Sequence, residues 1–262
     1  MTIRLYQKIS KIQYSARVVL GLLIFLLGWS SVTYTGLVQS FFLPTPTAVF
    51  SSIVMLFMEG NLASDISTSI YRILFGFLFS IAVALPFGVA LGMSRKLEAL
   101  IEPPIAFIRY IPPSAFIPLA IIWFGIGDLQ KVMIIFLGIA PYLTLLITDA
   151  VINTRRELVE AALTLGATNK NIIMKVVLPH AFPSIWDSFR LMMGAAWTFV
   201  IIAEIVGASS GLGHLMIESQ RFLRTDNIYA AIIIIGLLGL ATDYFFKITY
   251  KIYFPWTEKS YA

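Results

Sequence analysis

The chain of 262 residues contains no cysteine. Disulfides, thiol redox chemistry and thiolate metal sites are therefore excluded. Only 13% of its residues are charged, against about 25% in a typical soluble domain. Because so few charges could not cover the surface of a soluble domain, the composition indicates an integral membrane protein. The hydrophobic share of 58% and the mean hydropathy of +0.86 agree with this interpretation.

Motifs for energy conversion and electron transfer are missing as well. No G-x-x-x-x-G-K-[ST] segment occurs, so the chain cannot bind ATP in the P-loop manner. Energy from ATP hydrolysis must therefore come from another polypeptide. The two histidines, His180 and His214, are not paired at haem or metal spacing within an apolar run, which weighs against an electron-transfer subunit. Proton-coupled carriers use chains of intramembrane carboxylates and histidines, and none is visible here.

Apolar runs predict an all-α polytopic membrane protein with six spans in one domain. The spans are expected at residues 18–35, 66–93, 111–124, 132–150, 185–206 and 228–250, with an interfacial helix over 47–59. The third run contains Pro112, Pro113 and Pro118, which predicts a broken or kinked helix that lines a cavity. A tight turn is expected at 125–128, and a loop with a Gly-Leu-Gly turn over 207–227.

Lysine and arginine are unevenly distributed between the connecting segments. With the N-terminus inside, fourteen of them lie in the inner segments 1–17, 94–111, 151–182 and 247–262, and three in the outer segments 37–65, 125–131 and 207–227. The positive-inside rule therefore places both termini in the cytoplasm. The net charge of +5 would suggest nucleic acid for a soluble protein, but here the distribution matters more, and no nucleic acid is expected as a partner.

The longest segment without a membrane-grade apolar run covers residues 154–179, on the cytoplasmic side. Thr154 and Glu157 match a capping box for a first helix, and Gly166 stands where a C-cap glycine would end it. Its predicted apolar face consists of Leu158, Ala161, Ala162 and Leu165. Thr168 can cap a second short helix, with Pro179 at its end and an apolar face of Ile172, Ile173, Val176 and Val177. Two short helices at a glycine elbow suit insertion into a groove on another protein.

Within this segment, EAALTLGATNKNIIMKVVLP (160–179) resembles the EAA loop of permease subunits of binding-protein-dependent ABC importers. Glu160, Ala161, Ala162, Gly166, Leu178 and Pro179 match the pattern, whereas Val176 replaces the usual isoleucine. The resemblance implies a coupling helix that docks in a cleft of a cytoplasmic ATPase, against an alternative reading as an ordinary solvated loop helix. The docking residues would be Glu157, Glu160, Ala161, Ala162, Gly166, Ala167, Leu178 and Pro179.

Three further segments extend the resemblance to about residues 40–250. SIYRILFGF (69–77), PPSAFIPLAIIWFGIGD (112–128) and RLMMGAAWTFVIIAEIVGASSGLG (190–213) are similar to the nitrate, sulfonate, taurine and bicarbonate branch of these permeases. The branch implies a type I importer fold and ATP-driven import of a small anion by alternating access across a bacterial-type inner membrane. Expected partners are a second permease copy, two ATPases that hold ATP and Mg, a periplasmic or lipid-anchored binding protein, and lipid; this chain would hold no cofactor and no metal, and would not be an enzyme.

Charged and aromatic residues within the spans are candidates for the translocation pathway. Arg72 could supply positive potential at the outer mouth, or it could snorkel or pair with Asp65. Glu204 could gate the pathway or pair with a neighbouring subunit, although its sign favours a structural role. Arg190 is expected to snorkel. The remaining pathway candidates are Pro112, Pro113, Phe116, Pro118, Trp123 and Trp197, although each aromatic taken singly favours packing.

Three other functions stay open at this stage. An ABC importer of this branch could instead carry an organic nutrient such as a vitamin precursor. The chain could also be an ATP-independent secondary transporter, or a membrane anchor for a cytoplasmic enzyme. The substrate cannot be named from this chain, because selectivity in the family rests largely on the separate binding protein.

Overall fold

The computed structural model describes residues 10–58 and 61–257, and every regular element within these ranges is a helix. The predicted all-α fold is therefore confirmed. Arg4, Lys8 and Lys259, which contribute to the charge bias, and Glu59, the predicted end of the interfacial helix, lie outside the described residues.

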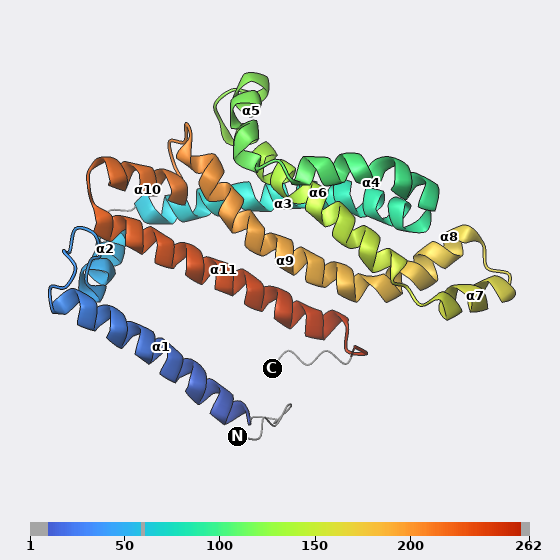
Figure 1. Ribbon diagram of the computed structural model, residues 1–262, viewed down its shortest axis with the longest axis horizontal. Helices are drawn as coiled ribbons and strands as arrows, with labels where there is room; N and C mark the ends of the chain where they lie inside the picture. The colour runs from blue at the N-terminus through green and yellow to red at the C-terminus, as the bar shows by residue number, and fades with distance from the viewer. Residues whose placement is uncertain (1–9, 59–60, 258–262) are drawn as a thin grey trace.

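Five long helices form most of the structure. They are α1 (Lys11–Tyr34), α3 (Asn61–Met93), α6 (Asp128–Ile152), α9 (Leu178–Ile205) and α11 (Thr225–Tyr253). In the described part of the chain, five helices are long and apolar enough to cross a membrane, or six if one bent pair counts as a span. Figure 1 shows α3, α6, α9 and α11 bundled together, whereas α1 runs apart from the bundle.

Within residues 10–58 and 61–257, six shorter α-helices accompany this bundle. They are α2 (Pro46–Met58), α4 (Arg95–Arg109), α5 (Ile117–Phe124), α7 (Arg156–Thr164), α8 (Asn169–Ile172) and α10 (Leu212–Arg221). Helices α7 and α8 lie at one end of the bundle, and α2 and α10 at the other (Figure 1). The prediction of a loop over 207–227 is wrong in part, because residues 212–221 of this segment form α10.

The third predicted span is broken, as expected, but its bounds are wrong. Helices α4 and α5 meet at an angle of 88°, with the 3₁₀ turn η1 (Pro113–Phe116) between them. Pro112 is extended, with φ −60° and ψ 134°, and proline also disfavours the helical region for the residue before it. The helix therefore stops before Pro112, and the half that precedes the break is α4, in a segment that the sequence placed in a polar connection.

Glycines bring α3 and α6 into close contact. A Cβ on Gly76 would lie 2.7 Å from the Cβ of Ile135, and a Cβ on Gly88 would lie 2.7 Å from that of Ile147. Thr148 Oγ1 on α6 donates to the carbonyl oxygen of Gly88 at 3.3 Å. Small residues allow membrane helices to approach closely, so dispersion contacts and weak polar contacts replace the missing hydrophobic drive. Helices α3 and α6 therefore pack closely at both glycines.

Candidate functional site

The predicted docking segment lies at one end of the bundle, and its first helix is α7. No residue of α7, which the structure describes in full, is buried. Val159 and Ala162 pack against the core, whereas Leu163 and Leu165 are 54% and 87% exposed. Of the predicted apolar face, Ala162 thus packs against the bundle, whereas Leu165 is exposed and available to a partner. Exposed leucines on a projecting helix are typical of a surface that binds another protein.

The predicted capping box is wrong. Helix α7 begins at Arg156, with Arg155 as the N-cap residue and no side-chain cap. Thr154 Oγ1 is buried without a hydrogen-bond partner among the residues that the structure describes. Glu157 instead pairs with Arg155 at 3.4 Å, and Glu160 pairs with Arg156 at 3.3 Å. Both glutamates of the docking segment thus make exposed ion pairs, which a partner protein could replace at little cost.

Gly166 ends α7 in the way the sequence predicts. Its φ is +73°, in the left-handed region that favours glycine. Its N–H donates to the Leu163 carbonyl at 2.9 Å, and the Ala167 N–H donates to the Ala162 carbonyl at 3.0 Å. These two bonds form a Schellman motif, which satisfies carbonyls at the end of the helix. The direction of the chain after α7 is therefore fixed by hydrogen bonds.

The second helix of the docking segment continues into the membrane bundle. Thr168 Oγ1 accepts from the Asn171 N–H at 3.4 Å and caps α8, as predicted. The predicted end at Pro179 is wrong, because α8 runs through the π-helical segment η2 (Ile173–Val177) into α9. Proline lacks an N–H and clashes with the carbonyl four residues earlier in a regular α-helix. Pro179 lies in the first turn of α9 and follows the π segment, and this position accommodates its ring. One unbroken helix therefore joins α8 to the bundle.

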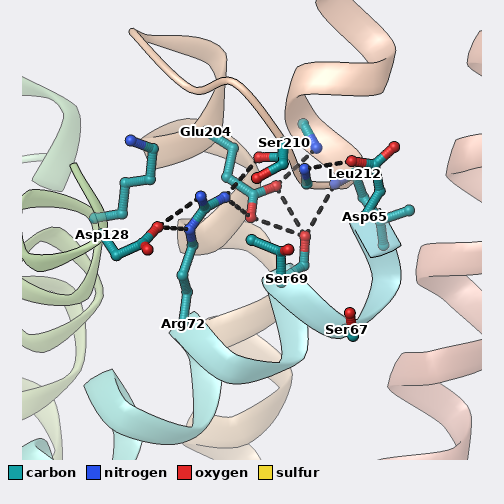
Figure 2. Close-up of polar contacts among 12 residues, drawn as sticks. Asp65, Ser67, Ser69, Arg72, Asp128, Glu204, Ser210 and Leu212 are labelled. Carbon is teal, nitrogen blue, oxygen red and sulfur yellow. Dashed lines mark hydrogen bonds and ion pairs between the residues drawn. The ribbon is translucent and has the colours of Figure 1, made fainter. Parts of the chain in front are cut away.

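At the opposite end of the bundle, Arg72 of α3 is the centre of a buried polar network (Figure 2). Arg72 is 3% exposed, and its Nη1 donates to Glu204 Oε1 at 2.8 Å and to the Ser210 carbonyl at 2.7 Å. Its Nε donates to Asp128 Oδ1 at 2.7 Å. The network thus connects α3, α6, α9 and the segment before α10. The predicted pairing of Arg72 with Asp65 is wrong, and Glu204 finds its basic partner within its own chain.

Glu204 also caps the N-terminus of α10, together with Ser69 and Asp65 (Figure 2). The backbone N–H of Gly211 donates to Asp65 Oδ1, that of Leu212 to Ser69 Oγ, and that of Gly213 to Glu204 Oε2. The donor–acceptor distances are 2.7, 2.9 and 2.8 Å. The first N–H groups of a helix lack internal partners and favour nearby negative charge. Asp65 and Glu204 therefore stabilise α10, and a Cβ on Gly211 or Gly213 would lie 2.5 or 2.7 Å from atoms of Glu204.

The sequence-predicted pathway residues do not gather at one place. Pro112, Pro118 and Trp123 are exposed, Pro113 and Phe116 are half-buried, and Trp197, Arg72 and Glu204 are buried. Trp197 Nε1 donates to Thr242 Oγ1 of α11 at 3.2 Å, so this side chain packs between helices. The lining of the pathway by this set stays a prediction.

Among three other polar residues, Lys247 has the partner that its spacing predicts, whereas the partners of Arg190 and His214 were not predicted. Arg190 does not snorkel but donates from Nε to Asp243 on α11. Lys247 also pairs with Asp243, at 2.9 Å and four residues further on, as its spacing suggests. His214 lies 3.9 Å from Glu218 within α10, whereas His180 is exposed.

The structure adds a cavity of about 630 Å³ between α4, α6 and α9. It is lined by Arg109, Tyr142, Leu145, Leu146, Asp149, Leu191, Met192, Gly194, Ala195 and Thr198. Sequence reasoning missed Arg109 because it counted this residue among the basic groups of a connecting segment. The signal that could have found it is its place directly before the Pro-rich break.

Comparisons with known proteins agree with the sequence resemblance. The profile of the family described as "Binding-protein-dependent transport system inner membrane component" matches residues 76–259. A probable ABC transporter permease protein of Brucella abortus is 37% identical over 89% of this chain and 92% of its own length. A putative aliphatic sulfonates transport permease protein, SsuC, of Bacillus subtilis is 31% identical over 87% of this chain and 83% of its own length.

The taurine transport system permease protein TauC of Escherichia coli is 29% identical, over 87% of this chain and 85% of its own length. Among solved structures, the MetNI methionine ABC transporter in an inward facing conformation has a TM-score of 0.70 at 20% identity. That match covers 75% of this chain and 97% of the other, and it shows a shared fold. The family match and the 37% identical relative show that the chain belongs to the inner-membrane components of binding-protein-dependent transport systems, as the permease subunit of an ABC importer.

Proposed function

We propose that this chain carries a small organic anion of the sulfonate type from the periplasm to the cytoplasm. Support comes from the SsuC and TauC relatives, whose names state sulfonate and taurine transport. Nitrate and bicarbonate are other small anions of the branch that the sequence resembles. The charge bias of the connecting segments supports a cytoplasmic position for α7 and for both termini.

The observation that carries the proposed mechanism is the unbroken path from α7 to the bundle. Exposed leucines on α7 offer a docking surface for the ATPase subunit, and the Schellman motif fixes α7 against α8. Helix α8 continues through η2 into α9, which packs along α6 and α11. A displacement of the ATPase would therefore move α9 as a rigid lever and convert an inward-open cavity into an outward-open one.

Two copies of the chain would form the complete pathway. Helix α5 projects from the bundle, although one side of it packs against α6 and α9 (Figure 1). Ile122 and Trp123 of α5 and Ile126 of the turn after it are 76%, 63% and 70% exposed. Such an apolar projection fits a homodimer, in which it would cover the neighbouring bundle. The binding protein would deliver substrate at the end of the bundle that carries α2 and α10.

The test is uptake of radiolabelled taurine, ethanesulfonate, nitrate and bicarbonate by a bacterial strain that lacks its own importers for them. The strain would express this chain with its ATPase and binding protein. ATP-dependent uptake of a sulfonate, lost with Glu160→Lys, is the expected result. Uptake of an uncharged vitamin precursor instead would refute the anion assignment, and uptake by this chain without the ATPase would indicate a secondary transporter.

A further inference from the structure

We infer that Arg109 binds the anionic group of the substrate inside the membrane, in the cavity between α4, α6 and α9. This inference rests on the proposed function and assigns a binding residue to it. Arg109 is the last residue of α4, and the cavity of about 630 Å³ that it lines is large enough for a small sulfonate. The cavity is distinct from the buried Arg72 network, whose charges are already paired.

The cavity extends from the middle of the bundle towards its α7 end, since its lining on α6 runs from Tyr142 to Asp149 in a helix that ends at Ile152. Its lining residues on α9 run from Leu191 to Thr198, in the centre of a helix that extends from Leu178 to Ile205. Arg109 is fourteen residues after the first residue of α4, which corresponds to about 21 Å along the helix. A charge at this depth is costly against lipid, so such residues face a protein interior or a water-filled path.

The guanidinium of Arg109 is held in place without being neutralised. Its Cζ lies 5.0 Å from the ring centroid of Tyr110 and 5.9 Å from that of Tyr142, and Nη2 donates to Tyr110 Oη at 3.3 Å. Its Nε is buried and has no hydrogen-bond partner within residues 10–58 and 61–257. Over the same ranges, no carboxylate forms an ion pair with it. An oriented, unpaired guanidinium presents a fork of donors that suits an oxyanion.

The other lining residues fit a small anion with a short organic part. Thr198 offers a hydroxyl, Gly194 leaves open space where a side chain would stand, and Leu145 and Leu146 supply apolar surface. Asp149 lies seven residues after Tyr142 on α6, about 10 Å nearer the α7 end of the bundle. The carboxylate of Asp149 can bind an ammonium group of the substrate or repel the anion towards release. It forms no ion pair with Arg109 in the part of the chain that the structure describes.

Arg109 is the basic residue in the last turn of α4, but an interaction with the dipole of that helix does not alone account for this arrangement. A basic residue in the last turn interacts favourably with the helix dipole, and such a role would be met by an exposed side chain. Arg109 is instead half-buried, stacked beside two tyrosines and directed along a cavity wall.

The absence of cysteine from the chain allows a direct test. In the full complex, Arg109→Gln should lower the taurine uptake rate about ten- to a hundredfold, as expected for loss of a charge-assisted hydrogen bond. Arg109→Lys should retain intermediate uptake, because one ammonium replaces the fork. Arg109→Cys should be inactive until 2-aminoethyl methanethiosulfonate restores a positive charge, and the negative sulfonatoethyl reagent should not restore uptake.

Arg95→Cys is the matched control, because Arg95 begins the same helix with an 84% exposed side chain. It should transport at the wild-type rate with either reagent. The chemical rescue is measured on complexes that are already folded, and co-purification of the ATPase reports assembly.

The inference is overturned if Arg109→Gln transports at the wild-type rate, or if both reagents restore Arg109→Cys equally. It is also overturned if Arg95→Cys responds in the same way as Arg109→Cys. Failure of the wild-type complex to take up any sulfonate would instead refute the proposed substrate. The same variants would then be assayed with whichever anion the wild type imports, and import of neutral substrates alone would refute both proposals.

Discussion

Arg72 Nη1 lies 2.8 Å from Glu204 Oε1, and the two residues are 3% and 1% exposed. They come from α3 and α9, and Asp128 of α6 shares the same guanidinium. A buried ion pair of this kind stabilises the fold only as a complete set, because either charge alone would remain desolvated without a partner. The pair therefore fixes how three spanning helices meet at the end that carries α10.

Removal of Arg72 should destabilise the chain strongly. Arg72→Met leaves Glu204 buried without its partner, so we expect a loss of about 3–5 kcal/mol in the free energy of unfolding. The double variant Arg72→Met/Glu204→Met should lose less than Arg72→Met alone. Thermal unfolding in detergent is the measurement, with Arg95→Gln as the exposed control. Equal melting temperatures for Arg72→Met and Arg95→Gln would contradict the assignment.

Gly88→Ala should separate α3 from α6. The added Cβ would lie 2.7 Å from Ile147 Cβ and 2.8 Å from the Thr144 carbonyl oxygen, which belongs to the backbone and cannot move alone. We expect a loss of about 1–3 kcal/mol, typical of overpacking. Gly236→Ala in α11 is the control, since a Cβ there meets open space, and it should be neutral or slightly stabilising. Similar effects of the two substitutions on the melting temperature would argue against a glycine-dependent contact.

Gly166→Pro should uncouple the ATPase without unfolding the bundle. Proline fixes φ near −65° and removes the N–H that donates to Leu163, whereas the native φ is +73°. We expect co-purification of the ATPase and uptake to be lost while the melting temperature is unchanged. Gly166→Asn is the matched control, because asparagine tolerates the left-handed region, and it should retain most binding. Full transport by the proline variant would show that α7 does not transmit motion.

Substitution of Trp197 should affect the stability of the chain, whereas substitution of Trp123 should affect its self-association. Trp197 is 5% exposed and donates to Thr242, so Trp197→Phe should lower the free energy of unfolding by about 1 kcal/mol and leave the KM for uptake unchanged. Trp123 is 63% exposed on α5, so Trp123→Ala should leave the melting temperature of the separate chain unchanged. It should weaken self-association, measured by cross-linking in membranes. A changed KM for Trp197→Phe would return this residue to the pathway.

Much of the fold follows from local sequence patterns. Hydropathy locates the long helices because each must satisfy its own backbone hydrogen bonds in lipid, whatever its neighbours are. Gly166 and Thr168 were predicted correctly for the same reason, since the Schellman motif and the α8 cap depend on residues within a few positions. The capping box predicted at Thr154 was wrong, because the chain enters α7 without using the Thr154 hydroxyl as a cap. Whether that hydroxyl can reach the helix depends on the direction in which the end of α6 leads the backbone.

Composition and short-range chemistry were enough to predict an all-α membrane chain, a Pro-rich break and two short helices joined at Gly166, because these features depend on residues close together in the sequence. Which of the buried charges are paired depends instead on tertiary packing. Arg72 and Arg109 are both arginines within or beside apolar runs, yet helix packing surrounds Arg72 with Glu204 and Asp128 and leaves Arg109 beside two tyrosines in a cavity. Their difference arises from contacts between helices far apart in the sequence, and hydropathy carries no information on those contacts.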